Sequence, residues 1–232
     1  MTETKDTPVR LDFPFVGIPS FLRSQICTDL DQLNADIAVF GIPHDEGSPF
    51  LSGSRMGPRS IREHSLRFGR EGSIYDPETR TQYLSEELGQ GLIADVGDVD
   101  VWPTEVRTTF KNATDMTRKI LAKGAFPVML GGAHGGTYPV VRGFNEPLHV
   151  MHFDAHIDYA PFIHDLQFTN GHPFSNIKPL QHVESLTQIG IRSLRSAQSQ
   201  IHASIDDGNR VITMGEFHDI GGQGVAEILP KD

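Results

Sequence analysis

The sequence predicts an α/β sandwich around a mostly parallel sheet, and three observations lead to that prediction. Short apolar runs recur along the chain without the alternation of a half-exposed strand, as in strands buried on both faces. Stretches with helical signals separate these runs, which is the strand–helix–strand order of parallel sheets. Glycine, with 23 residues, and proline, with 15, are slightly abundant, which suits a fold with many tight turns between strands and helices.

The predicted strands follow one another along most of the chain, and each is closed by a glycine or a polar residue. They are expected over residues 36–41, 92–97, 126–131, 149–154, 186–191 and 210–214. Residues 1–35, which contain Pro8, Pro14 and Pro19, are expected to form an N-terminal arm on the surface. Residues 36–232 are expected to form the α/β domain.

Helices are expected where capping signals meet helical spacing. Pro58 favours the first turn of one helix, and a second is expected between Thr104 and Gly124, where a glycine ends the pattern. Two more are expected to begin within residues 138–144 and 224–229. In open parallel sheets the chemistry lies at the carboxyl ends of the strands, so functional residues are expected in the loops that follow them.

Composition excludes several classes of protein. The net charge of −10 and the lack of a basic cluster argue against a nucleic-acid partner. No apolar stretch is long enough to span a membrane, and residues 1–10 are too polar for a signal peptide. The single cysteine, Cys27, is expected to be a small buried side chain. One cysteine cannot form an internal disulfide, which fits a reducing, cytoplasmic location.

A metal site is indicated by the spacing of Asp154, His156 and Asp158. Side chains at alternate positions of an extended segment point to one face, so these three are expected to converge after the run that starts at His149. Two carboxylates beside an imidazole suit a divalent ion with octahedral preferences, Mn²⁺ before Zn²⁺. A solvated strand end is the alternative interpretation.

A glycine-rich turn over residues 131–136 adds a fourth candidate ligand. It places His134 directly after another buried run, where glycines let the backbone turn sharply and approach its neighbours closely. The turn lacks the spacing of a nucleotide-binding loop. His134 is therefore expected to project above the sheet beside the strand that leads to Asp154.

These motifs together resemble the arginase/agmatinase (ureohydrolase) family. The resemblance rests on Gly-Gly-Ala-His at 131–134 and Asp-Ala-His-Ile-Asp at 154–158, and also on the segments at 53–62 and 95–98. It covers residues from about 36 to 192, and the segment at 53–62 makes the chain closer to agmatinases than to true arginases.

The resemblance implies a three-layer α/β/α sandwich that holds two Mn²⁺ ions per subunit. His134 is expected to bind one ion and His156 the other, with Asp154 touching both and Asp158 binding the first. A hydroxide between the ions would attack the guanidinium carbon and release urea and an amine, because paired metals lower the pKa of water. Agmatine is the expected substrate, and the expected assembly is a homo-oligomer, a trimer or hexamer.

Departures from the family pattern shape the remaining expectations. Asn170 stands where the family has a proton-shuttling histidine, so Asn170 is a candidate for substrate binding and His172, two residues later, a candidate for the shuttle. Ala133 and Gly135 replace an aspartate and a serine or threonine. No Ser-x-Asp-x-Asp segment precedes Asp232, so the chain is expected to be truncated at its C-terminus, without the last strands of the sheet and with a weakened second metal site.

Three alternatives stay open on the sequence. The substrate could be guanidinobutyrate, guanidinopropionate, arginine or guanidine itself. The chain could be a single-zinc deacetylase on a similar sandwich, although the segment at 53–62 and Asp158 argue against it. It could also be a catalytically impaired, truncated subunit or a pseudoenzyme, which Ala133, Asn170 and the missing strand favour.

Overall fold

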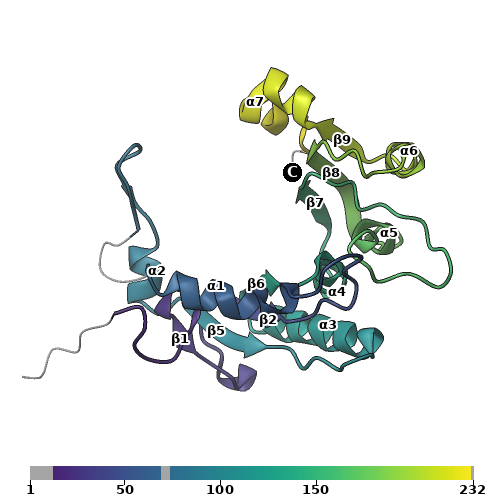
Figure 1. Ribbon diagram of the computed structural model, residues 1–232. Helices are drawn as coiled ribbons and strands as arrows, with labels where there is room; N and C mark the ends of the chain where they lie inside the picture. Colours follow the sequence, from purple (N-terminus) through teal and green to yellow (C-terminus); the bar gives the residue numbers. More distant parts are fainter. Residues whose placement is uncertain (1–12, 69–73, 231–232) are drawn as a thin grey trace, which may run out of the picture.

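The computed structural model describes residues 13–68 and 74–230 and contains two parallel sheets (Figure 1). The first has the strand order β1-β5-β2-β6 and the second the order β7-β8-β9. The first sheet is built from β1 (Gln25–Ile26), β5 (Ile93–Asp98), β2 (Ile37–Ile42) and β6 (Phe126–Gly131). The second is built from β7 (Leu148–Phe153), β8 (Val183–Ile191) and β9 (Arg210–Thr213). All six predicted strands are thereby confirmed, and their pairing is parallel throughout both sheets.

Helices connect these strands, and a short antiparallel hairpin, β3 (Tyr75–Asp76) with β4 (Thr81–Gln82), lies outside both sheets. The α-helices are α1 (Gly57–Ser65), α2 (Ser85–Gly89), α3 (Val106–Ala122), α4 (Thr137–Val141), α5 (Pro173–Ile177), α6 (Gln198–Asp206) and α7 (Met214–Ile228). Short 3₁₀ turns occupy η1 (Phe21–Arg23), η2 (Leu30–Gln32), η3 (Ser54–Met56) and η4 (His134–Gly136). The helix expected near residue 224 begins earlier, at Met214, and is kinked at Gly221, where φ is 66°. Among the described residues, no helix has both the length and the apolar character needed to cross a membrane.

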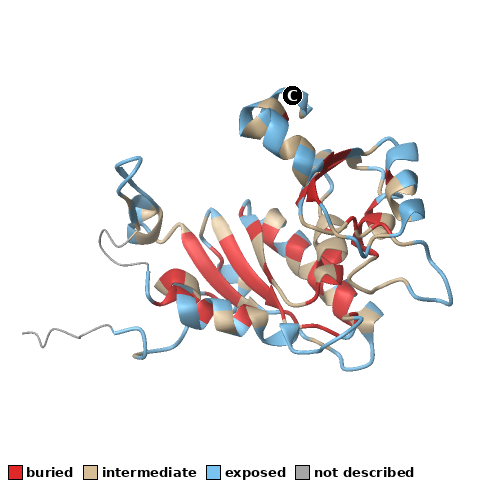
Figure 2. Ribbon diagram, turned by 45° about the horizontal axis from the view of Figure 1, so that its top comes forward, coloured by how far each residue is buried: buried red, intermediate tan, exposed pale blue. Residues whose placement is uncertain are grey.

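Helices cover both faces of the first sheet, which confirms the layered α/β sandwich. On one face Phe40 of β2 packs in a buried cluster with Ala113 and Ile120 of α3. On the other face Val39 packs with residues of α2, including Leu88. The second sheet has its own core around Phe174 of α5, so buried residues concentrate in two bodies (Figure 2).

The described part of the expected N-terminal arm lies against the first sheet. β1 pairs with β5 as an edge strand, and Leu22, Cys27 and Leu33 are buried. Burial of Cys27 agrees with its expected role as a small apolar side chain. Residues 1–12 and the chain end at 231–232 lie outside the described residues, so the expectations for those segments have no structural counterpart here.

An ion-paired arginine fastens α1 to β5. Arg62 donates from Nε to Asp95 Oδ2 at 2.7 Å and from Nη1 to Asp98 Oδ1 at 2.6 Å. The second oxygen of Asp95 accepts from Arg62 Nη2 at 3.0 Å, and Asp95 Oδ2 also accepts from the backbone N–H of Phe21. The segments at 53–62 and 95–98, which carried part of the family resemblance, therefore meet each other in a structural network.

β6 is an edge strand of the first sheet, and β7, the next strand in the chain, is an edge strand of the second. Among the described residues, β6 pairs with β2 alone and β7 with β8 alone, so each presents an unpaired edge. Figure 1 shows the sheets standing apart at these edges, joined through α4. The side chains of Met151 and Phe153 on β7 are largely exposed.

Candidate metal centre

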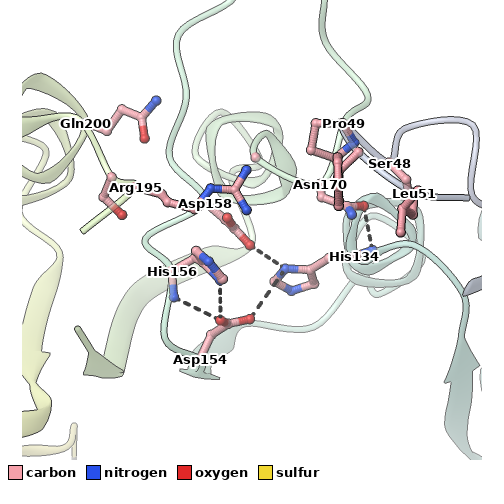
Figure 3. Close-up of a pocket in the computed structure, with 13 residues that line it drawn as sticks. Ser48, Pro49, Leu51, His134, Asp154, His156, Asp158, Asn170, Arg195 and Gln200 are labelled. Carbon is pink, nitrogen blue, oxygen red and sulfur yellow. Dashed lines mark hydrogen bonds and ion pairs between the residues drawn. The ribbon is translucent and has the colours of Figure 1, made fainter. Parts of the chain in front are cut away.

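A pocket of about 480 Å³ opens where the carboxyl ends of four strands meet (Figure 3). Its walls come from the loops after β2, β6, β7 and β8, which agrees with the expectation that chemistry lies at this end of the sheet. The volume lies within the range of small-molecule sites. The lining residues are Ser48, Pro49, Phe50, Leu51, His134, Asp154, His156, Asp158, Asn170, Gly171, Arg195, Ser196 and Gln200.

Close backbone contact holds His134 at the tip of β6. Ala133 N donates to His44 O at 2.6 Å, and a Cβ atom on Gly132 would lie 2.2 Å from that same carbonyl oxygen. Only glycine fits there, which explains the predicted glycine-rich turn. Asn170 Oδ1 then accepts from the backbone N–H of His134 at 3.0 Å, so a residue of the facing loop fixes the turn.

Three of the four predicted ligands converge closely. His134 Nδ1 lies 2.6 Å from Asp158 Oδ2 and 3.9 Å from Asp154 Oδ2. Asp158 reaches this position with a positive φ of 45°, a left-handed conformation that aspartate tolerates better than most residues. The strand tips of β6 and β7 thus bring together an imidazole and two carboxylates.

The fourth predicted ligand, His156, lies beside the group on the other side of Asp154. β7 ends at Phe153, and the chain then turns so that His156 N donates to Asp154 Oδ1 at 2.9 Å. His156 Nδ1 lies 3.2 Å from the same oxygen, and its side chain is about half exposed. The two oxygens of Asp154 consequently face different histidines, His156 and His134 (Figure 3).

His152 is a member of the group that sequence reasoning missed. His134, His152, Asp154 and Asp158 can each offer a ligand atom such that all four atoms lie within 4.8 Å of one another. His152 precedes Asp154 by two residues on β7, so the alternation that linked Asp154 to His156 also pointed backwards to His152. β7 includes His152 but ends before His156. Strand alternation therefore places His152 beside Asp154 more reliably than it places His156.

Hydrogen bonds beneath His152 determine which ring nitrogen carries its proton. The Gln188 amide donates from Nε2 to Ile157 O at 2.6 Å, while its Oε1 accepts from Ser204 Oγ at 2.6 Å. This orientation leaves the second Nε2–H of Gln188 directed at His152 Nδ1, 3.2 Å away. His152 Nδ1 is therefore an acceptor, and Nε2 carries the proton and lies 3.6 Å from Asp154 Oδ2.

The charge states of the group follow from burial and neighbours. Burial, together with nearby His134, lowers the pKa of His152 to about 4, so this imidazole is neutral near pH 7. Burial alone would raise the pKa of Asp154, but the N–H of His156 and the neighbouring imidazoles outweigh it and lower that pKa. The centre therefore holds an anionic carboxylate, the protonation state that metal ligation requires, beside a neutral buried imidazole.

The donor set fits divalent metal ions. His134, Asp154 and Asp158 supply nitrogen and oxygen ligands of the kind that Mn²⁺ accepts. The two oxygens of Asp154, each near a different histidine, also suit a carboxylate shared between two ions. The buried Nε2 of His152 has no hydrogen-bond partner among the described residues. A buried polar atom without a partner therefore lies beside Asp154.

The two residues predicted near position 170 have different surroundings. Asn170 lines the pocket, and its Nδ2 group has no protein partner among the described residues. His172 is buried outside the pocket lining, with Nδ1 2.7 Å from Thr169 Oγ1 and Nε2 3.2 Å from Pro161 O. Both ring nitrogens of His172 are occupied in holding its loop, so the structure does not bring the expected proton shuttle to the metal centre.

Comparison with known proteins points to one family. The model of the arginase family matches residues 35–231. Guanidinopropionase of Pseudomonas aeruginosa is 31 % identical over 218 residues, and mitochondrial agmatinase of Gallus gallus is 32 % identical over 206 residues. The solved structure of proclavaminate amidinohydrolase from Streptomyces clavuligerus superposes with a TM-score of 0.75 at 26 % identity, covering 93 % of this chain and 69 % of that one.

The matches also differ from this chain in length. The guanidinopropionase alignment covers 89 % of this chain but 64 % of its relative, and the agmatinase alignment covers 87 % and 58 %. The chain therefore spans roughly three fifths of the curated relatives named here.

Proposed function

The chain belongs to the arginase family, and from this premise we propose that it is an amidinohydrolase that cleaves a guanidino compound to urea and an amine. The observation that carries the proposal is the convergence of His134 with Asp154 and Asp158 in one pocket at the strand ends. The names of its relatives, which include an agmatinase, a guanidinopropionase and a guanidinobutyrase, support a guanidino substrate.

Manganese is the proposed cofactor, held by His134, Asp154 and Asp158, with His156 and Asp154 offering ligands to a second ion. When bound, such ions supply a nucleophilic water at neutral pH and stabilise negative charge on the reacting centre. A solved formiminoglutamase of Trypanosoma cruzi that shares this fold contains Mn²⁺. The chemistry of the donors here supports the same choice.

The protein's own residues contribute position and shape. Asn170 fixes the backbone of His134 through Oδ1, and its Nδ2 group faces the pocket as a donor for the substrate. Asp158 Oδ2 lies 2.6 Å from His134 Nδ1, so these two side chains present their ligand atoms at one point of the pocket. Pro49, Phe50 and Leu51 form an apolar wall that suits the methylene chain of a guanidino compound.

The proposed substrate is a guanidino compound, and several such compounds are candidates. Agmatine is the expectation from the sequence motifs, with guanidinobutyrate and guanidinopropionate as the alternatives. These compounds share the guanidinium but differ in the charge at the far end of the chain. The residues at the pocket rim are therefore the ones that distinguish them.

Urea release tests the proposal directly. The purified protein, supplied with Mn²⁺, is assayed against agmatine, 4-guanidinobutyrate, 3-guanidinopropionate and arginine. Urea should appear with at least one of them, and Asp154→Ala should abolish it, because that substitution removes the carboxylate between the two histidines. Absence of urea from the whole panel, with Mn²⁺ bound, would refute the proposed function.

A further inference from the structure

Resting on the proposed function, we propose that this pocket selects guanidino compounds whose far end is a carboxylate, and that Arg195 is the residue that determines this preference. The inference concerns the end of the pocket away from the metal ligands. It divides the candidate substrates by charge, since agmatine ends in an ammonium group and the guanidino acids end in a carboxylate.

Among the residues that the structure describes, every carboxylate that lines the pocket belongs to the candidate metal centre. Asp154 and Asp158 are the acidic residues among the described lining residues, and both contact His134. Two bound divalent ions would bring a charge of +4 against −2 from these aspartates. Within the described part of the chain, no lining carboxylate is left to pair with the ammonium group of agmatine.

Two acidic residues in the loop after β2 make contacts that are directed elsewhere. Asp45 is buried and accepts from Arg55 Nε at 2.6 Å and from the backbone N–H of Gly53 at 2.6 Å. Glu46 accepts from the backbone N–H of Thr104 at 3.0 Å. Neither residue lines the pocket.

Arg195 places a cation in the pocket instead. It follows β8, and Figure 3 shows its side chain reaching from that loop into the pocket on the side of Asp158. Its backbone N–H donates to Ser193 Oγ at 3.2 Å, which fixes the loop. Among the residues that the structure describes, the Arg195 guanidinium has neither a hydrogen bond nor an ion pair, so its donors are available to a ligand.

The chemistry of this cation matches a carboxylate. A guanidinium presents parallel N–H donors that bind both oxygens of a carboxylate, and such charge-assisted bonds are stronger than neutral ones. Ser196 and Gln200 line the pocket beside it and add polar groups at the same rim. An ammonium group in that position would meet a like charge.

Binding measurements on matched ligands test the inference. Affinities for 4-guanidinobutyrate and agmatine, whose chains are of similar length, are measured by calorimetry on the Mn²⁺-loaded protein. The wild type should bind 4-guanidinobutyrate at least about tenfold more tightly. Arg195→Gln should remove most of that difference, and Arg195→Glu should reverse it in favour of agmatine. High salt should reduce the preference, because the pair is partly exposed to solvent.

Arg192→Gln is the matched control, since it removes the same charge from the same loop. The side chain of Arg192 donates to Gly190 O at 3.1 Å and lies outside the pocket lining. The inference is overturned by equal affinities in the wild type, by a preference for agmatine, by binding of neither ligand, or by an equal loss in Arg192→Gln. If the protein prefers the carboxylate ligand through Arg195 but releases no urea, the proposed reaction is wrong and the inferred selectivity stands. If it releases urea but shows no such preference, the proposed reaction stands and the inferred selectivity is wrong.

Discussion

At the scale of single residues, His152 lies beside a carboxylate of the candidate metal centre. Gln188 fixes the proton of His152 on Nε2, and this nitrogen faces Asp154 Oδ2. A protonated ring nitrogen has no lone pair for a metal ion, and at 3.6 Å the N–H of His152 faces Asp154 without a hydrogen bond to it. The geometry therefore makes His152 a positioning residue for Asp154, within a cluster that by distance alone would include it as a ligand.

Removing this imidazole from beside Asp154 should weaken metal binding. His152→Phe is expected to lower the affinity for Mn²⁺ about 10- to 100-fold, the usual effect of losing a partner that orients a ligand. His152→Gln keeps an N–H group and should lose less. Titration calorimetry with Mn²⁺ measures both variants, and thermal unfolding checks that they are folded. Wild-type affinity in His152→Phe would show that Asp154 needs no such support.

His44 is a buried imidazole for which the fold provides no hydrogen bond. Its side chain is almost fully buried, neither ring nitrogen has a partner among the described residues, and its ring packs edge-on against Phe110. Burying an unsatisfied polar group costs about 1–3 kcal/mol. His44→Leu, which fills the space with carbon, should therefore raise the free energy of unfolding by about 1–2 kcal/mol in chemical denaturation at pH 7.5.

The same variant should change the pH dependence of stability. Burial lowers the pKa of His44 from its usual 6.5, so below pH 6.5 the unfolded chain takes up a proton that the folded chain excludes. The stability tied to the neutral imidazole is present above pH 6.5 and is lost as the pH falls towards the folded pKa. The advantage of His44→Leu should consequently grow between pH 7 and pH 5.5, and a constant difference would contradict this account.

Sequence spacing predicted the residue types of the centre better than their arrangement. Asp154, Asp158 and His134 converge as expected because strand tips of a parallel sheet share one edge. His156 was placed by strand alternation, but the strand ends before it, and a turn sets its position instead. Neither the turn nor the Gln188 hydrogen bonds that orient His152 could be read from the sequence, because they depend on segments distant in the chain.

At the scale of elements, the Arg62 network replaces apolar packing between α1 and β5. Arg62 and Asp95 are both nearly inaccessible, and Asp95 also accepts from the backbone N–H groups of Phe21 and Gly97. Breaking such a buried pair leaves a charge without compensation, which usually costs more than the pair itself contributes. The network thus holds the N-terminal segment, α1 and β5 together.

Arg62→Met should destabilise the protein by about 3–5 kcal/mol, because Asp95 is left buried without its cation. Chemical denaturation measures this loss. The double variant Arg62→Met with Asp95→Asn should recover part of it, since the uncompensated charge is then gone. Arg59→Met on the same helix is the control, because Arg59 pairs with Glu63 on the exposed surface. A comparable loss in Arg59→Met would show that helix propensity, and not the buried pair, is responsible.

Long apolar elements were predictable and short polar ones were not. The six main strands are apolar runs that differ clearly from the loops around them. By contrast, α6 has a mostly polar sequence and β1 is a pair of residues held in place by β5. Their conformations depend on tertiary contacts rather than on local sequence, so no local sequence pattern predicts them.

At the scale of the whole molecule, the metal centre is the place where the two sheets act together. His134 follows β6 of the first sheet, whereas Asp154 and Asp158 follow β7 of the second. Each sheet has its own buried core, so a ligand bound to residues from both resists their separation. Binding to the folded state alone stabilises a protein in proportion to the logarithm of ligand concentration.

Mn²⁺ should therefore raise the unfolding temperature, and a chelator should reverse the change. At a concentration of about 100 times the Kd, the stabilisation is about 2.7 kcal/mol. Differential scanning fluorimetry with increasing Mn²⁺ measures it, and Asp154→Ala should show no shift. An equal shift in Asp154→Ala would place the metal elsewhere on the molecule.

The pocket walls come from separate loops, so substitutions can change one wall without changing the others. The candidate metal ligands stand on the loops after β6 and β7, while Arg195 and its neighbours stand on the loop after β8. Substitutions in the loop after β8 can therefore change the pocket rim without altering the candidate metal ligands. Ligand preference at the rim and metal ligation at the base of the pocket can for that reason vary independently of each other.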